Sequence, residues 1–75
     1  MVNTYAKAVS EEVVSHDKHL KNLKTFLYVF ERDLQQMDIS NDEKFLLWMR
    51  TELAICKVGE AIDAMDILKE TLEEV

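Results

Sequence analysis

The chain has 75 residues, a formal net charge of −6, no proline, one glycine and one cysteine. A chain this short forms one domain at most, and its core supplies only about 3–5 kcal/mol, so association with another protein surface is expected. The single cysteine, Cys56, excludes an internal disulfide. The scarcity of proline and glycine predicts an all-α fold, because little in the sequence interrupts a helix.

Charge and hydropathy exclude other classes of protein. The negative charge argues against a general nucleic-acid-binding protein, whose affinity comes from neutralising phosphates. The longest apolar runs, 26–30 and 45–49, are far shorter than the roughly 20 residues that cross a bilayer. A free thiol without an export signal favours a reducing compartment. We therefore expect a cytoplasmic protein without a membrane span.

Residues 4–37 are predicted to form one long amphipathic helix. Apolar residues recur there at alternating spacings of four and three, as in a coiled-coil seam. The seam members are Val2, Ala6, Val9, Val13, His16, Leu20, Leu23, Leu27, Phe30, Leu34 and Met37. Because the seam keeps its phase through Ser10 and Ser15, a continuous helix is favoured. A break near Ser10 or Ser15, which would give a three-helix bundle, is the alternative.

A turn at 38–40 and a second helix over about 41–74 complete the predicted fold. Ser40 followed by Glu43 is typical of a capping box, which starts a helix. The second seam consists of Leu47, Thr51, Ala54, Val58, Ala61, Met65, Leu68, Leu72 and Val75, and the residues Trp48, Ile55 and Ile62 widen it. Two long helices joined by a short turn pack antiparallel, so residues 1–75 are expected to form one helical-hairpin domain.

Apolar residues outside both seams gather in the half of the hairpin nearest the turn. This turn-end patch consists of Tyr28, Val29, Phe45, Leu46, Met49, Leu53 and Cys56. A monomer would expose the patch, and large exposed apolar patches mark interfaces. We therefore expect a homodimer in which two hairpins form a four-helix bundle and cover the patch. If the chain is instead monomeric, the patch becomes the candidate binding site for another protein.

His16 and Cys56 are the residues in the seams and the patch that invite a chemical interpretation. His16 and His19 lie near Glu12 at helical spacing, but the second helix has no histidine, so a di-metal carboxylate site is not supported. His16 is interpreted as a polar seam residue that specifies register. Cys56 is interpreted as a small packing residue, because Lys57 points about 100° away around the helix.

Acidic residues dominate the end of the second helix. They are Glu60, Asp63, Asp66, Glu70, Glu73 and Glu74, against the single cation Lys69. This acidic docking face would suit a basic partner, or would imitate the phosphates of a nucleic acid. The alternative interpretation is a solvated face that keeps the protein soluble.

A modest basic and polar strip lies on the first helix and consists of Lys18, Lys21, Asn22, Lys24 and Thr25. The layout resembles, in architecture, the dimeric helical hairpins that regulate plasmid copy number by binding paired RNA loops. The resemblance implies RNA binding on the outer face of the bundle, which the net negative charge argues against.

No pattern in the sequence combines a nucleophile, a base and an orienting group, and a two-helix layer offers no evident concave pocket. The sequence therefore predicts a non-enzymatic protein–protein interaction module without a cofactor, acting as a small regulator or inhibitor. The alternatives are an acidic nucleic-acid mimic that inhibits a DNA-binding protein, an RNA-binding hairpin, and a structural subunit of a larger assembly.

Overall fold

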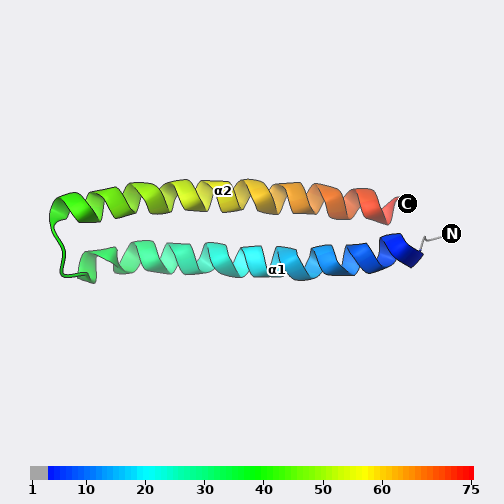
Figure 1. Cartoon of the computed structure of the whole chain (residues 1–75), viewed down its shortest axis with the longest axis horizontal. Coiled ribbons are helices and arrows are strands. Elements are labelled where there is room, and N and C mark those ends of the chain that lie inside the picture. Colours follow the sequence, from blue (N-terminus) through cyan, green and yellow to red (C-terminus); the bar gives the residue numbers. More distant parts are fainter. Residues whose placement is uncertain (1–3) are drawn as a thin grey trace.

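The computed structural model describes residues 4–75, and over this range the chain is a hairpin of two long antiparallel helices (Figure 1). Helix α1 spans Thr4–Asp33, a short 3-10 helix η1 spans Leu34–Gln36, and α2 spans Asn41–Glu73. The hairpin measures 59 × 15 × 12 Å, and the start of α1 lies beside the end of α2, opposite the turn. The predicted all-α helical hairpin is confirmed; Val2 of the predicted seam lies outside the described residues.

Helix α1 continues without a break through Ser10 and Ser15, as the phase of the seam predicted. The three-helix alternative is therefore wrong. The helix ends at Asp33 instead of Met37, because its last turn tightens into η1, where the Met37 N–H donates a hydrogen bond to the Leu34 carbonyl at 3.1 Å. Tightening of this kind satisfies carbonyls that an α-helix leaves free at its end.

Side-chain hydrogen bonds fix the turn between the helices. Ser40 caps α2, and its hydroxyl accepts the Glu43 N–H at 3.2 Å, as the sequence predicted. The Lys44 ammonium donates to the Gln35 carbonyl at 3.1 Å and so ties the end of η1 to the first turn of α2. Leu34, 1% exposed, is the most deeply buried side chain of the described residues.

The contact surface of α1 differs from the predicted seam. Ala6, Val13 and Leu34 are buried, as predicted, but the buried residue between them is Asp17, and its neighbour His16 is exposed. The contact with α2 is centred slightly to one side of the predicted seam. Because successive residues of a helix point about 100° apart, Asp17 then faces α2 and the preceding residue, His16, does not. Asp17 thus replaces His16 as the polar residue of the hairpin seam.

The same shift occurs on α2. Ile55 and Ile62, predicted only to widen the apolar face, are buried, whereas Leu68 of the predicted seam is 42% exposed. Thr51 is also buried, and its hydroxyl donates to the Leu47 carbonyl at 2.7 Å. The resulting core is narrow, because the buried apolar side chains of the described residues are Ala6, Val13, Leu34, Ile55 and Ile62.

Candidate interaction surfaces

The structure places all seven residues of the turn-end patch on the surface. Phe45 and Leu53, for example, are 61% and 52% exposed. The patch does not form one flat face. Consecutive members such as Phe45 and Leu46 point about 100° apart, so the five members on α2 wrap around the outer side of that helix, while Tyr28 and Val29 lie on α1.

An aromatic pair forms the most structured part of this surface. The rings of Phe45 and Trp48 stack with their centroids 6.2 Å apart and their planes at 28°. Beside them is a hollow that is lined by both rings together with Gln35, Asn41 and Lys44. Exposed aromatic side chains next to a hollow and a few polar groups are typical anchors of protein interfaces. Sequence reasoning assigned Trp48 to the face of the second seam, and the structure places it at this surface.

Polar residues line one edge of the helix–helix contact, a feature that the sequence analysis missed. Lys21 Nζ lies 2.9 Å from Asp17 Oδ2, and this hydrogen bond lowers the pKa of Asp17, to which Asp66 and Lys69 on α2 also contribute. Further along, a hydrogen bond with Glu52, followed by burial and charge repulsion, raises the pKa of Glu31. The sequence feature that indicates this polar edge is a seven-residue repeat of polar side chains, namely Ser10, Asp17, Lys24 and Glu31.

His16 lies outside the hairpin contact. Its side chain is 66% exposed, and Nε2 is 3.4 Å from Glu12 Oε2 one turn earlier. The ring of His19 is 6.3 Å away, centroid to centroid. Within residues 4–75, no three histidine, cysteine or acidic side chains come together in a way that could hold a metal ion.

Cys56 is exposed, so its interpretation as a small packing residue is wrong, and its Sγ lies 3.9 Å from Glu60 Oε1. A reactive thiol is usually activated by a nearby cation or a helix N-terminus. The contact observed here is instead with an acidic group in the middle of a long helix. The geometry therefore suits a surface residue of the turn-end patch better than a nucleophile.

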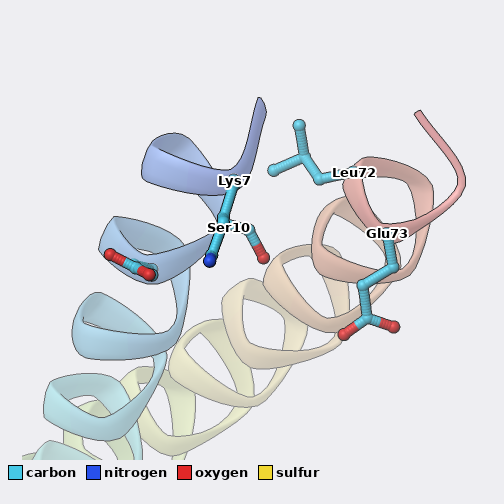
Figure 2. A pocket seen from close by; sticks show the side chains of 5 residues that line it. Lys7, Ser10, Leu72 and Glu73 are labelled. Atoms are coloured by element: carbon cyan, nitrogen blue, oxygen red, sulfur yellow. The ribbon is translucent and has the colours of Figure 1, made fainter. Parts of the chain in front are cut away.

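The acidic docking face is exposed except for Asp66, which turns toward α1 and is partly buried. Glu60 pairs with Lys57 at 3.6 Å. Near the open end of the hairpin, Glu73 also lines a hollow together with Lys7, Ser10, Glu11 and Leu72; Figure 2 shows the first two of these projecting from α1, opposite Leu72 and Glu73 on α2. Most of these acidic side chains thus point from α2 into solvent, whereas Asp66 and Glu73 lie toward α1.

Over residues 4–75, neither helix has a stretch that is both long and apolar enough to cross a membrane. No protein-family model, curated protein or solved structure matches the chain. The surfaces described above are therefore the basis for any functional assignment.

Proposed function

We propose that this chain is a non-enzymatic interaction protein, a small regulator or inhibitor that binds another protein through the turn-end patch. The observation that carries the proposal is the exposed, stacked pair of Phe45 and Trp48 beside a hollow with polar walls. Aromatic side chains supply much of the binding energy in protein interfaces because they bury large areas at a small entropic cost.

The rest of the patch supports the same function. Tyr28, Met49 and Leu53 are each about half exposed. Because each is already half buried, a docked partner that covered the rest would gain roughly half of the 1.5–3 kcal/mol that full burial of such a side chain supplies, about 1 kcal/mol apiece. The exposed thiol of Cys56 is best preserved in a reducing compartment, which supports a cytoplasmic location.

Photo-crosslinking tests the proposal. A photoreactive phenylalanine analogue replaces Phe45 in one version of the chain and Asn22, an exposed residue of α1, in a control version. We expect a discrete crosslinked product with another protein from position 45 only. Unlabelled wild-type chain should compete for the product, whereas the Phe45→Asp, Met49→Asp double variant should not. Absence of any product from position 45, or equal competition by the double variant, would contradict the proposal.

The acidic docking face favours a second candidate function, an acidic mimic of a nucleic acid. Asp63 and Glu70 are exposed on the outer side of α2. A mimic of this kind would compete with DNA for a basic protein, and salt would weaken the competition by screening the charges. The Asp63→Asn, Glu70→Gln variant should then lose potency while Phe45→Asp keeps it, the reverse of the outcome expected for the turn-end patch.

A further inference from the structure

We propose that a second copy of this chain packs against one long face of the hairpin and completes a four-helix bundle. This stripe face consists of Val9, His16, Leu23 and Phe30 on α1 and Leu47, Ala54, Ala61 and Leu68 on α2. It is distinct from the turn-end patch, so the dimer leaves the aromatic pair of Phe45 and Trp48 available to another protein. The inference does not depend on the proposed function.

The two edges of the helix–helix contact place these residues on one face. On one edge, Asp17 lies near Asp66 and Lys69, and Glu31 lies near Glu52. The same edge carries Lys24, whose Nζ would be 3.7 Å from a Cβ built at Gly59. A contact between two helices has only two edges. The residues on the opposite side of the contact from Asp17, Lys24 and Glu31, on both helices, therefore lie together along the second edge. Those positions repeat every seven residues and are the members of the stripe face.

The distribution of charged and apolar side chains between the two edges differs from that expected for a monomer in water. The edge that carries Asp17, Lys24 and Glu31 is charged, yet all three residues are buried or partly buried. The stripe face is apolar at every position but His16. Five of its residues are partly buried, but Leu23 and Leu68 are 43% and 42% exposed. A water-facing edge normally carries the charged residues of an amphipathic helix. The distribution is explained if the stripe face is an interior surface of a larger bundle.

The accessible area of the hairpin supports a partner of the size of a second copy. The chain has a mass of 8.8 kDa and an accessible surface of 5902 Å², whereas a compact monomer of that mass exposes about 4,800 Å². The excess is about 1,100 Å² for each chain. A stable interface buries roughly 800 Å² or more on each partner. Two hairpins that cover each other would therefore remove an area close to the excess.

The shape of the stripe face suits self-association. On α2, the small residues Ala54 and Ala61 occupy the middle, and Leu47 and Leu68 lie toward the ends. Small residues allow helices to approach closely, and large residues next to them fill the remaining space, so the layers of a bundle interdigitate. Together with the other members of the two predicted seams, the stripe face then forms the interior of the bundle, and His16 becomes its polar member.

Sedimentation equilibrium of the reduced wild-type chain is the first test. We expect a dimer at micromolar concentration. A monomer at tens of micromolar would overturn the proposal and leave the stripe face to a different protein.

Matched variants identify the face. Leu23→Asp places a charge on the stripe face, and Val14→Asp places one at an equally exposed position, 46% against 43%, near the opposite edge of α1. On α2, Leu68→Glu changes the stripe face, and its control Ile67→Glu changes a more exposed position outside that face, 65% against 42%. We expect Leu23→Asp and Leu68→Glu to raise the dimer Kd by at least about 100-fold, because each puts an unpaired charge into an apolar interface. Dissociation by Val14→Asp or Ile67→Glu instead would overturn the proposal.

A measurement on the wild-type chain covers the case in which a variant fails to fold. In a mixed sample of isotope-labelled and unlabelled chains, intermolecular nuclear Overhauser effects should reach the methyl groups of Leu23, Ala54 and Ala61. Contacts that reach Val14 and Ile67 instead would place the second copy on another face. Crosslinking from position 45 is a separate measurement, so failure of the dimer and failure of the proposed partner site can be told apart.

Discussion

The carboxyl group of Glu31 in α1 faces that of Glu52 in α2 across the hairpin, and hydrogen bonding to Glu52, burial and charge repulsion together hold the pKa of Glu31 above its ordinary value of 4.5. Two carboxylates that meet in this way repel each other once both are ionised. The pair lies on the charged edge of the helix–helix contact, opposite the stripe face. Changes to this pair are therefore expected to alter the stability of the hairpin and not the affinity of the proposed dimer.

Glu31→Gln is expected to raise the free energy of unfolding at pH 7. In the wild-type chain the folded state binds the Glu31 proton more tightly than the unfolded state, so this contribution to stability is present below the unfolded pKa and is lost as pH rises through the folded pKa. Wild-type stability should thus increase as pH falls from 7 toward 5, and the variant should lack most of that increase. Urea titrations followed by circular dichroism, at fixed protein concentration, measure both curves.

Glu70→Gln is the control for the loss of one negative charge, because Glu70 is exposed on α2. An equal gain in the two variants at pH 7 would show that net charge, and not the contact with Glu52, is responsible. Below about pH 4 a second effect has the opposite sign. Lys21 lowers the pKa of Asp17, so the stability from that pair is lost as pH falls through the lowered value.

The local features of the fold could be predicted from the sequence because short-range chemistry determines them. Ser40 and Glu43 mark the start of α2, and an unbroken apolar phase carries α1 through Ser10 and Ser15. The last turn of α1 could not be predicted in the same way. Its tightening at Leu34 depends on the packing of that side chain against α2 and on the Lys44 bond to the Gln35 carbonyl.

The flank of each seam that faces the other helix could not be predicted from periodicity alone. Ala6, Val13 and Leu34 belong equally to a frame that continues with His16 and Leu23 and to one that continues with Asp17 and Lys24. Hydrophobicity favours the first frame, whereas the hairpin contact uses the second. The apolar side of each helix is wider than the area that one neighbouring helix can cover. The sequence therefore shows which residues are apolar, but not which of them face the other helix of the hairpin.

Leu34→Ala should be the most destabilising single truncation in the hairpin. The side chain is 1% exposed and packs at the turn, so its removal loses buried apolar area and leaves a cavity. We expect a loss of about 2–5 kcal/mol in the free energy of unfolding. Met37→Ala, at a residue that is 38% exposed, should cost less than about 1.5 kcal/mol. Similar costs for the two variants in urea titrations would contradict the burial of Leu34.

Gly59→Ala is expected to stabilise α2 by about 1 kcal/mol, since glycine in a helix interior leaves more backbone entropy to be lost on folding. The new Cβ would meet Lys24 Nζ at 3.7 Å, an ordinary van der Waals distance to a flexible side chain. Ala64→Gly, at an exposed position in the same helix, should cost a similar amount. A destabilising Gly59→Ala would show that Lys24 needs the space above Gly59.

Ser40→Ala tests the N-cap of α2. The Ser40 hydroxyl accepts the Glu43 N–H at 3.2 Å, and its loss leaves that donor without its cap, so we expect a cost of about 1 kcal/mol. Ser40→Asp should retain most of the stability, because a carboxylate also caps a helix and interacts favourably with its dipole. Ser15→Ala, at an exposed site inside α1, should change little. If Ser40→Ala were neutral in urea titrations while Leu34→Ala remained costly, burial at the turn, and not the cap, would set where α2 begins.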